Sequence, residues 1–375
     1  MRIAVNTRLL LSGKLEGIGW FTCQTFKKMV KNHPECEFHF IFDRQYNPEF
    51  IFADNVKPVV LFPQARHPLL YYLFFEQSLP RYLGKTKPDL FVSPDGLLSL
   101  AYSGKQVPVF HDLNFMHHPH YLPFLSRKYY TGFFPKYAKI SERIATVSEY
   151  SKKDIIKTFG YPAEKIDVVY NGVNEIFRPV EKGRMGEIRE KYARGFPYFV
   201  YVGSLHKRKN IDRMLQAFEQ FKKSDNGGHK LVIVGEPMFG SLLSKKIYTS
   251  MNSKDDVIFV GRLYEEELRD VIGGSTALLL VSHFEGFGIP ILEAMNCDVP
   301  VITSNVTSMP EVAGGAALLV DPGSVQSIAN AMQKITAEPA LRNTLIEKGR
   351  TQRERFSWEK TAERMWECLE KAMEK

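Results

Sequence analysis

The feature that most constrains the fold is a series of short apolar runs and helical stretches that stops and then starts again. The first series contains "MRIAVNT", a helical "GWFTCQTFKKMVKNH", "EFHFIFD", "PDLFVSP", "VPVFHD" and "RIATVSE". Residues 175–197 are charged and bounded by prolines, and "PYFVYVGS" then opens a second series. Short strands that alternate with helices are typical of βαβ units and parallel sheets. The sequence therefore predicts an α/β protein of two similar halves.

A chain of 375 residues is also too long for one ordinary core, and about 100–200 residues per domain is usual. We predict an N-terminal Rossmann-like domain over 1–175, a linker over 176–196 and a C-terminal Rossmann-like domain over 197–356. The tail "WEKTAERMWECLEKAMEK" has apolar residues at helical spacing, so 357–375 is predicted to be an amphipathic helix.

Several classes of protein are disfavoured by composition. With 44% apolar and 25% charged residues, the chain has the composition of a soluble globular protein. No apolar run approaches the roughly 20 residues that span a bilayer, and the N-terminus does not resemble a signal peptide. The four cysteines are scattered without a CxxC pair, so we expect a cytoplasmic protein.

The net charge of +8 calls for an explanation. Between Tyr121 and Gly160, lysines and arginines outnumber acids and alternate with aromatic residues. This pattern is typical of a face for an anionic membrane or a phosphorylated substrate. A solvated helical surface over core aromatics explains it about equally well. No nucleic-acid-binding motif accompanies the charge, so we do not expect nucleic acid as a partner.

The stretch "HFEGFGIPILEAM" holds two acids, Glu285 and Glu293, around a glycine turn that follows an apolar strand. Gly286 and Gly288 allow the backbone to approach a ligand, and Pro290 suits the first turn of a helix. Ligands of open α/β sheets bind at such strand-to-helix loops. Carboxylates accept from sugar hydroxyls, and the helix N-terminus suits phosphate, so the stretch predicts a ligand with both groups. For Glu293 a favourable contact with the helix dipole is the simpler alternative.

A second loop, "YVGSLHKRKN", ends a strand at Gly203 and carries Lys207, Arg208 and Lys209. Clustered cations in such a loop would counter a diphosphate, although an ordinary solvated run of charge is common.

In the first half, "GIGW" places Gly17 and Gly19 at a tight turn after the first strand. "VPVFHD" places His111 at the end of another strand, where it could contact a substrate hydroxyl or act as an acid or base. A structural histidine is equally consistent with the sequence. Further histidines at 117, 118 and 120 fit no zinc pattern, and the chain has no Asp-x-Asp pair, so we expect no metal and no other cofactor.

Taken together, these motifs resemble the family-4 retaining glycosyltransferases of the GT-B superfamily (glycosyl transferases group 1). "EGFGIPILE" fits that family's E-x7-E motif, and "YVGSLHKRKN" fits its phosphate loop. "VFHDL", "ATVSEYSKKDI", "VVYNGVNEIFRP" and "VITSNVTSMPEVAGGAALLVDP" are similar to further landmarks in the family's order. One departure is Ser204, where many members carry arginine.

The resemblance implies a fold and a function. It implies two Rossmann-like domains whose parallel sheets face each other across a cleft, the N-terminal one on the acceptor side and the C-terminal one for the nucleotide-sugar donor. The last helix would pack back on the N-terminal domain. It implies metal-independent, retaining transfer of a hexose-type sugar from a UDP- or GDP-sugar to a hydroxyl of a glycan or lipid-linked acceptor. Cell-surface polysaccharide or lipopolysaccharide synthesis, at the inner face of the membrane, would be the setting.

The resemblance also implies roles for residues. Arg208 and Lys209 would hold the diphosphate, Glu285 the transferred sugar and Glu293 the ribose, with His111 near the sugar. The predicted catalytic residues are His111, Glu285, Arg208 and Lys209. The predicted donor-binding residues are Gly17, Gly19, Gly203, Arg208, Lys209, Leu263, Glu285, Phe287, Gly288, Ile289 and Glu293.

Two rival functions share this architecture. A nucleotide-sugar 2-epimerase would need further acid and base carboxylates, and a glycan phosphorylase would need a lysine for pyridoxal phosphate; neither is marked in the sequence. A non-catalytic sugar-nucleotide-binding protein would be expected to lack Lys209 or Glu285, and both are present.

Overall fold

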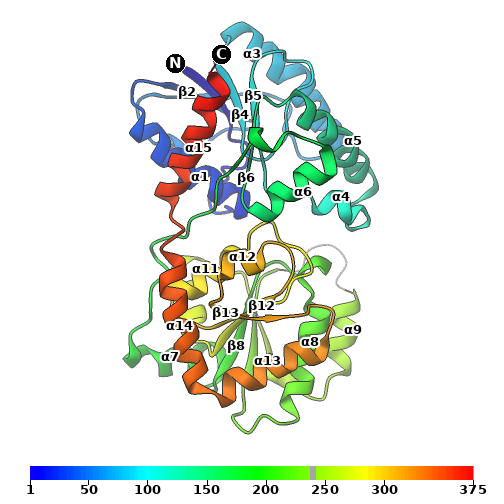
Figure 1. The fold of residues 1–375 in the computed structure, drawn as a ribbon, viewed down its shortest axis with the longest axis vertical. Helices are drawn as coiled ribbons and strands as arrows, with labels where there is room; N and C mark the ends of the chain where they lie inside the picture. The colour runs from blue at the N-terminus through cyan, green and yellow to red at the C-terminus, as the bar shows by residue number, and fades with distance from the viewer. Residues whose placement is uncertain (237–241, 375) are drawn as a thin grey trace. The chain divides into compact units, whose positions relative to one another are not determined.

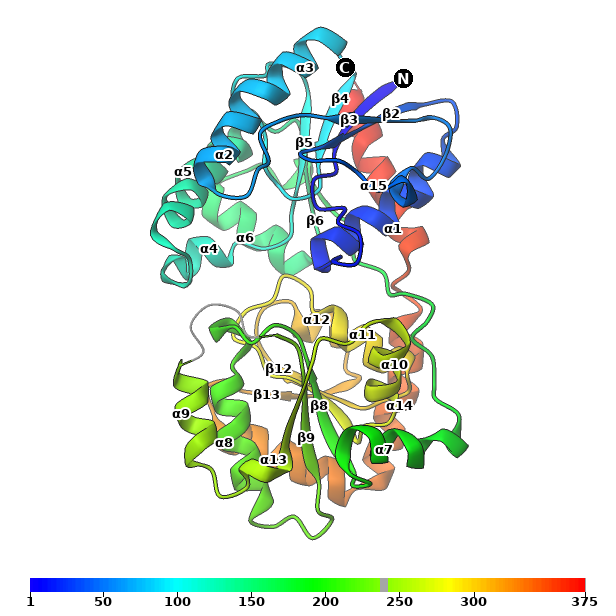
Figure 2. The same cartoon turned by 180° about the vertical axis from the view of Figure 1, so that it is seen from behind.

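The computed structural model describes residues 1–236 and 242–374. The chain divides into two compact units, each built on its own parallel sheet (Figures 1 and 2). Unit 1 comprises Met1–Gly172 together with the C-terminal segment that starts at Ser357, and unit 2 comprises Val173–Phe356. The prediction of two Rossmann-like α/β halves is confirmed.

Unit 1 contains a seven-stranded parallel sheet in the order β3-β2-β1-β4-β5-β6-β7. The strands are β1 (Arg2–Asn6), β2 (Glu37–Phe42), β3 (Val56–Val60), β4 (Leu90–Ser93), β5 (Gln106–Phe110), β6 (Ile144–Thr146) and β7 (Ile166–Val168). The two edge strands, β3 and β7, are absent from the sequence-based list of strands. β3 carries Lys57 and Pro58 and β7 is three residues long, so neither shows a continuous apolar run.

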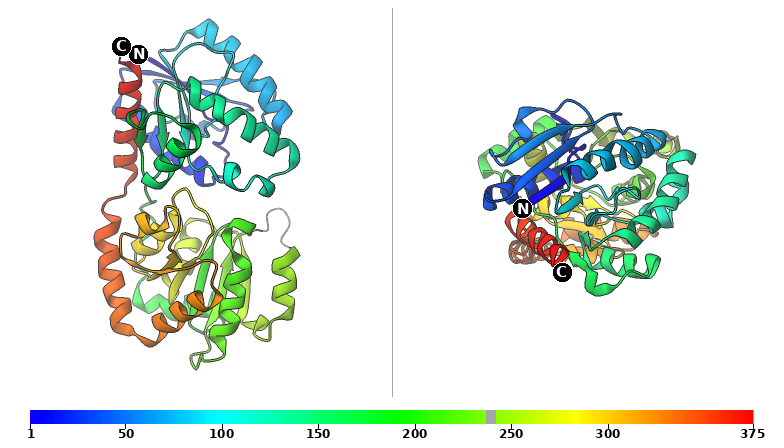
Figure 3. Two further views of the ribbon diagram at one scale, coloured as in Figure 1. Left: turned by 45° about the vertical axis from the view of Figure 1, so that its right-hand side comes forward. Right: turned by 90° about the horizontal axis from the view of Figure 1, so that it is seen from above.

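One face of this sheet is covered by α1 (Gly17–Asn32) and the C-terminal helix α15 (Trp358–Met373), which pack against each other (Figure 3). The Phe26 ring of α1 meets the Phe40 ring of β2 edge-on at 6.2 Å. Lys105 Nζ donates to the carbonyl oxygens of Ala372, Met373 and Glu374 at 2.9–3.1 Å, so a cation caps the last turn of α15. The terminal helix is thereby fixed to unit 1.

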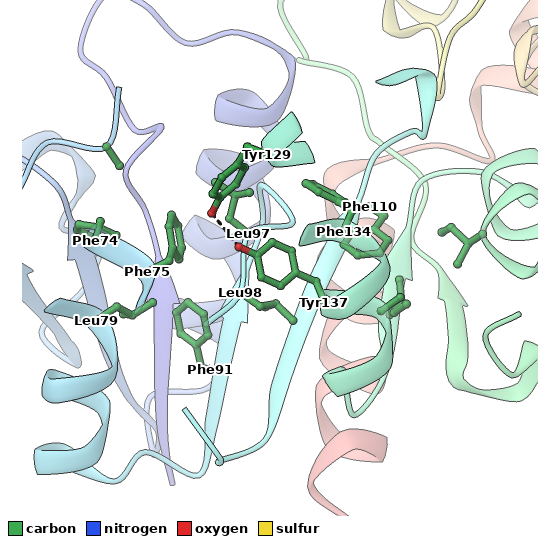
Figure 4. Close-up of a cluster of buried hydrophobic side chains, with 14 of the residues drawn as sticks. Phe74, Phe75, Leu79, Phe91, Leu97, Leu98, Phe110, Tyr129, Phe134 and Tyr137 are labelled. Carbon is green, nitrogen blue, oxygen red and sulfur yellow. Dashed lines mark hydrogen bonds between the residues drawn. The ribbon is translucent and has the colours of Figure 1, made fainter. Parts of the chain in front are cut away.

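The opposite face is covered by aromatic helices (Figure 4). These are α2 (Pro68–Leu73), which continues through a π-turn into α3 (Leu79–Thr86), α5 (Phe124–Ile140) and α6 (Glu149–Phe159), while α4 (Asn114–His117) packs on α5. Tyr129 and Tyr137 of α5 are buried and share a hydrogen bond of 2.8 Å between their hydroxyls. Part of the aromatic residues in 121–160 therefore belong to the core, as expected if this region is a solvated helical surface over core aromatics.

Unit 2 contains a six-stranded parallel sheet in the order β10-β9-β8-β11-β12-β13. The strands are β8 (Tyr198–Val202), β9 (Lys230–Val234), β10 (Val257–Gly261), β11 (Ala277–Leu280), β12 (Val301–Ser304) and β13 (Ala317–Val320). β8, β9, β11 and β12 are almost wholly buried, which agrees with their uninterrupted apolar sequences.

The helices of unit 2 form two groups around this sheet (Figures 1 and 2). One contains α8 (Ile211–Lys222), α9 (Leu242–Ser250) and α13 (Val325–Ala337). The other contains α7 (Met185–Ala193), α10 (Glu265–Gly273), α11 (Ile289–Asn296), α12 (Met309–Ala313) and α14 (Pro339–Arg353).

Residues 176–196, which we predict as a linker, lie within unit 2 and contain α7. Ile188 and Tyr192 of this helix are buried, four residues apart, while its charged residues are mostly exposed. A single apolar stripe is enough to attach a helix to a core, and the surrounding charges hide that stripe in the sequence. Among the residues that the structure describes, no helix combines the length and apolar character needed to cross a membrane.

Candidate active site

The loops after β8 and β11 bring two of the predicted motifs together at the carboxyl end of the unit 2 sheet. The first loop carries Arg208 and Lys209, and the second carries Glu285 before α11 begins at Ile289. Gly288 precedes α11 with φ of 101°, a backbone conformation that L-residues with side chains rarely adopt, and Pro290 lies in the first turn. The glycine turn and the helix start that the sequence predicts are confirmed.

Three charged side chains meet at the centre of this arrangement. Lys209 Nζ donates to Glu285 Oε1 at 2.6 Å, and Arg208 Nη1 donates to Glu285 Oε2 at 2.7 Å. Ser282 Oγ also donates to Glu285 Oε1 at 2.7 Å. Glu285 is 5% exposed and Lys209 is 8% exposed, so this is a buried charge cluster.

The electrostatic balance of the cluster is uneven. Burial alone would raise the pKa of Glu285, but Arg208 and Lys209 outweigh it, and the pKa falls to about 2. The carboxylate is therefore ionised at neutral pH. Among these three side chains two cations meet one carboxylate, and two cations side by side favour an anionic ligand.

Polar residues that the sequence analysis missed hold the Glu285 loop in place. Ser308 Oγ lies 2.9 Å and 3.0 Å from the carbonyl oxygens of Glu285 and Phe287, and the Glu285 backbone N–H donates to Thr307 Oγ1 at 3.3 Å. Ser308 belongs to the quoted landmark "VITSNVTSMPEVAGGAALLVDP", so its motif was visible although its contact was not.

The loop after β8, which carries Arg208 and Lys209, is held from both sides. Asn210 Nδ2 donates to the carbonyl oxygens of Val281 and Pro322 at 2.9 Å and 2.8 Å, and Asn210 itself has φ of 61°. His206 Nδ1 accepts from the Arg208 backbone N–H at 3.2 Å. Burial and the neighbouring cations lower the pKa of His206, which keeps Nδ1 free of a proton and able to accept. A Cβ on Gly203 would lie 2.9 Å from the Tyr201 hydroxyl oxygen, closer than real Cβ atoms come, so the glycine leaves room for that hydroxyl.

Glu293 differs from Glu285 in its position, its hydrogen bonding and its pKa. It lies in the second turn of α11, not the first, so the helix-dipole alternative for this residue loses its basis. The structure shows no hydrogen bond or ion pair from its carboxylate to any described residue. Burial raises the pKa of Glu293 to about 7. A partly buried carboxylate without partners is available to accept hydrogen bonds from a ligand.

The remaining predicted residues of unit 2 lie around this cluster. Phe287 is buried and packs edge-on against Phe356 at 5.7 Å, so its side chain belongs to the core. Ile289 opens α11. Leu263 is half-buried and follows β10, between Arg262 and Tyr264, whose guanidinium and ring lie 5.1 Å apart.

In unit 1, His111 follows β5 at the carboxyl edge, as predicted. Its Nε2 donates to the Pro94 carbonyl oxygen at 2.8 Å, which leaves Nδ1 without a proton in the neutral ring. The ring also meets Phe21 edge-on at 5.1 Å. Burial lowers the pKa of His111. Packing holds the imidazole in its neutral state, with Nδ1 as an acceptor.

The two glycines of "GIGW" have different surroundings. A Cβ on Gly19 would lie 3.0 Å from the Leu9 carbonyl oxygen, so Gly19 allows α1 to approach the preceding loop. A Cβ on Gly17, the first residue of α1, would meet nothing within 4 Å. Gly19 has a packing role that the structure shows, and Gly17 has open space beside it.

The histidines that follow β5 are tied to their own surroundings. His117 Nε2 lies 2.8 Å from Asp154 Oδ1, and the ring of His118 stacks on Tyr121 at 5.2 Å. Among residues 1–236 and 242–374, no three His, Cys, Asp or Glu side chains are grouped so that they could hold a metal ion.

Comparison with known families decides the identity of this arrangement. The family "Glycosyl transferases group 1" matches residues 185–352, and "Glycosyltransferase Family 4" matches residues 25–176. Together these matches extend over most of both units and include both loops of the charge cluster. The chain is a family-4 glycosyltransferase of the GT-B fold.

Individual relatives of this glycosyltransferase agree. It is 29% identical over 256 residues to O-antigen chain mannosyltransferase B of Escherichia coli, covering 68% of this chain and 67% of that one. It is 31% identical over 223 residues to O-antigen chain mannosyltransferase RfbU of Salmonella typhimurium, covering 59% of each. The crystal structure of Anabaena HepE in complex with UDP and glucose superposes with a TM-score of 0.76 at 16% identity, covering 98% of this chain and 99% of that one.

Proposed function

We propose that this glycosyltransferase moves a hexose from a nucleotide diphosphate sugar to a hydroxyl of a glycan or lipid-linked acceptor, with retention and without a metal ion. The observation that carries the proposal is the cluster in which Arg208 and Lys209 both donate to the carboxylate of Glu285.

The excess positive charge of this cluster supports its role as a diphosphate site. A diphosphate brings negative charge that Arg208 and Lys209 can satisfy by charge-assisted hydrogen bonds. When the sugar–phosphate bond breaks, negative charge grows on the leaving diphosphate, and fixed cations in a buried site stabilise it. This is the task that a divalent metal performs in other transferases.

The two acids then hold opposite parts of the donor. Glu285 is ionised and lies within the cluster, so it can accept from hydroxyls of the transferred sugar. Glu293 lies eight residues further along the chain and has a carboxylate that no described residue engages. We assign it to the ribose hydroxyls, whose two donors match the two oxygens of a carboxylate.

The chemical step follows from the proposed retention. The acceptor oxygen bonds to the anomeric carbon on the face from which the diphosphate leaves, and the bond from that carbon to the phosphate oxygen breaks. The leaving phosphate takes the proton of the acceptor hydroxyl. His111 Nδ1 is the acceptor atom that we assign to a sugar hydroxyl in unit 1. Glu285 is no nucleophile in this scheme, since its carboxylate is held by two cations and a serine.

The relatives indicate a setting in cell-surface polysaccharide synthesis. The two bacterial relatives are O-antigen chain mannosyltransferases, and HepE was crystallised with UDP and glucose. Mannose is therefore the first sugar to test, and both UDP and GDP sugars belong in the test.

The test is a panel of UDP- and GDP-sugars incubated with the protein and an oligosaccharide or polyprenyl-linked acceptor. We expect acceptor-dependent release of UDP or GDP, an α-configured product from an α-configured donor, and no loss of rate in EDTA. Abolition by EDTA contradicts the metal-free mechanism. Interconversion of sugar nucleotides without acceptor contradicts transfer and identifies an epimerase. Binding of nucleotide sugars without any turnover identifies a non-catalytic protein.

We also propose that unit 1 contacts an anionic membrane surface on the cytoplasmic side. Leu69 and Tyr72 of α2 are exposed, as are Phe124 and Leu125 of α5, and the two helices lie side by side (Figure 2). Lys128 Nζ lies 4.5 Å from the Phe124 ring centroid, so a cation accompanies the exposed apolar residues. Apolar residues beside cations suit a lipid–water interface.

Co-sedimentation with liposomes tests this surface. We expect binding to vesicles with anionic lipid, weaker binding to neutral vesicles, and loss of binding in Phe124→Ser/Leu125→Ser. Phe259, which is 46% exposed in unit 2, provides the control substitution Phe259→Ser. Equal sedimentation of the double variant and wild type contradicts the assignment.

A further inference from the structure

Unit 1 has an open depression of about 520 Å³ beside the carboxyl ends of β1 and β2. It lies between the loop that joins β1 to α1 and the loop that follows β2. Its lining residues are Leu10, Leu11, Ser12, Lys14, Arg44, Gln45, Tyr46, Asn47 and Pro48. The donor-binding prediction includes none of these residues, and neither does the cluster around Glu285.

Arg44 is held in a fixed position at this depression. Its Nε donates to Asp43 Oδ1 at 2.7 Å, and its Nη2 donates to Asp43 Oδ2 at 3.0 Å. The Asp43 carboxylate is fully buried and also accepts from the Ala65 backbone N–H at 2.9 Å. Arg44 Nη1 has no hydrogen bond to any described residue. A buried acid thus orients the guanidinium and leaves one of its nitrogens available to a ligand.

A second cation reaches the depression from the other loop. Lys14 is exposed, and the structure shows no bond from its ammonium to the described part of the chain. No acid contributes to the lining. Glu16 and Glu49 follow nearby along the chain, and both are exposed to solvent, where water screens their charge. The lining therefore presents two cations, of which Arg44 is paired with the buried Asp43 carboxylate and Lys14 has no ion pair with a described residue.

Tyr46 adds an aromatic surface to these charges. Its ring stacks on Phe42 of β2 with centroids 5.2 Å apart and planes at 28°, so its orientation is fixed by the core. Gln45 and Asn47, on either side of it, are exposed. The Gln45 amide can donate to and accept from hydroxyls, and the Asn47 amide can donate, since its oxygen accepts from the Glu49 N–H at 3.0 Å. An aromatic face with amides suits a sugar ring, and the cations suit an oxyanion.

We infer that this depression is an acceptor subsite for a phosphorylated sugar, in which Arg44 and Lys14 bind the phosphate and Tyr46 lies against the ring. The inference rests on the proposed transferase function, because it assigns the acceptor to a subsite of unit 1. It adds a substrate class: the acceptor carries a phosphate or diphosphate near the sugar that is bound here.

The test measures binding of two probes, mannose 1-phosphate and methyl α-mannoside, to the full chain by isothermal titration calorimetry. We expect mannose 1-phosphate to bind at least about tenfold more tightly than methyl α-mannoside, because one or two charge-assisted hydrogen bonds supply that difference in free energy. Arg44→Gln and Lys14→Gln should each lower the affinity for mannose 1-phosphate by about tenfold. Lys27→Gln, at an exposed lysine of α1 with no partner among the described residues, should leave its binding unchanged.

Lys209→Ala distinguishes this subsite from the donor site. If Lys209→Ala abolishes binding of mannose 1-phosphate and Arg44→Gln does not, the probe binds at the cluster around Glu285 and the inference is overturned. Equal affinity for the two probes also overturns it. Because Arg44→Gln leaves the buried Asp43 with fewer partners, Lys14→Gln is the decisive variant if the former fails to fold.

Transfer is measured separately, so the two proposals can fail independently. If Arg44→Gln and Lys14→Gln lose the phosphate probe but no nucleotide sugar is turned over, the anion subsite stands and the transferase assignment fails. If transfer proceeds and its acceptor KM is unchanged in Lys14→Gln with a phosphorylated acceptor, the subsite assignment fails alone.

Discussion

Each unit buries an arginine–carboxylate pair at the carboxyl edge of its sheet, and the two pairs are built differently. In unit 1, Arg8 Nε donates to Asp95 Oδ2 at 2.5 Å, with the two side chains 8% and 4% exposed. In unit 2, Arg208 pairs with Glu285 at 2.7 Å, with the side chains 25% and 7% exposed. Both pairs follow strands at the edge where α/β proteins bind ligands.

The difference lies in what surrounds each pair. The other oxygen of Asp95 accepts from Asn6 Nδ2 and Ser93 Oγ, and Arg8 also donates to the Ala65 carbonyl oxygen. Charges cancel there, and the protein supplies the partners. Around Glu285 a second cation, Lys209, leaves the charge unbalanced. The Arg8–Asp95 pair, whose hydrogen bonds the protein itself supplies, is a structural element, whereas the cluster at Glu285 is the one to which we assign a ligand.

The largest expected effect is on stability, from breaking the balanced pair. Arg8→Met leaves the Asp95 carboxylate buried without its cation, which should cost about 3–5 kcal/mol of the free energy of unfolding. Urea unfolding of the unit 1 transition measures it. Arg8→Met/Asp95→Asn should recover most of the loss, since the amide needs no counter-charge. Equal stability of Arg8→Met and wild type would show that the pair is not the structural element that its contacts suggest.

The next effect is on catalysis, from removing one cation of the unbalanced cluster. Lys209→Ala should lower kcat by about 10²–10³-fold, the usual effect of deleting one group that stabilises a transition-state charge. Glu285 keeps Arg208 and Ser282, so the fold should survive. Lys207→Ala is the matched control, because Lys207 is exposed in the same turn and should change kcat little. A wild-type rate in Lys209→Ala, measured as acceptor-dependent nucleotide release, contradicts the site.

The same contrast explains what the sequence could predict. The sequence shows the strand ends and glycines of the two loops that carry Glu285, Arg208 and Lys209. The proximity of these three residues could therefore be predicted. Arg8 and Asp95 are 87 residues apart and belong to no motif, so their pairing depends on β1 lying next to β4.

Other differences have equally physical reasons. Asn210 stands at the N-cap position of α8, where asparagine usually caps, but it makes no capping bond because its amide bonds two distant loops. The lining of the depression at Arg44 was invisible, because it comes from two loops that parallel pairing of β1 with β2 brings together. Motifs in the sequence do not reveal which strands lie next to each other in a sheet, so contacts that depend on strand order could not be predicted.

A third prediction concerns Glu293, the carboxylate without partners. Its pKa is about 7 in the folded chain against an ordinary 4.5, so between these values the folded chain holds a proton that the unfolded chain has lost. The contribution of Glu293 to stability is therefore present below pH 4.5 and is lost as the pH rises through 7. Glu293→Gln should match wild type near pH 4 and be more stable by about 2 kcal/mol at pH 8, allowing for partial exposure.

Glu293→Gln should affect nucleotide binding in the opposite direction to stability. Glu293→Gln should bind UDP or GDP more weakly than wild type at pH 8, and this deficit should disappear with the 2′,3′-dideoxy nucleotide. Stability curves that run parallel from pH 4 to 8 would show that Glu293 does not titrate in this range. An undiminished affinity in Glu293→Gln would remove the ribose assignment.

The smallest expected effect comes from adding charge to the unbalanced cluster. Ser204 stands where many family members carry arginine, and its hydroxyl makes no hydrogen bond to the described residues. Its backbone carbonyl, which accepts from the Tyr201 hydroxyl and the His206 N–H, is kept when the side chain is replaced. Ser204→Arg should lower the donor KM by about two- to fivefold, the contribution of one partly solvated charge contact. Ser204→Gln, of similar length without charge, is the control. Because the gain is electrostatic, it should shrink from 50 mM to 500 mM salt. A Ser204→Gln variant that improves KM as much as Ser204→Arg would show that side-chain length, and not excess positive charge, sets donor affinity at this loop.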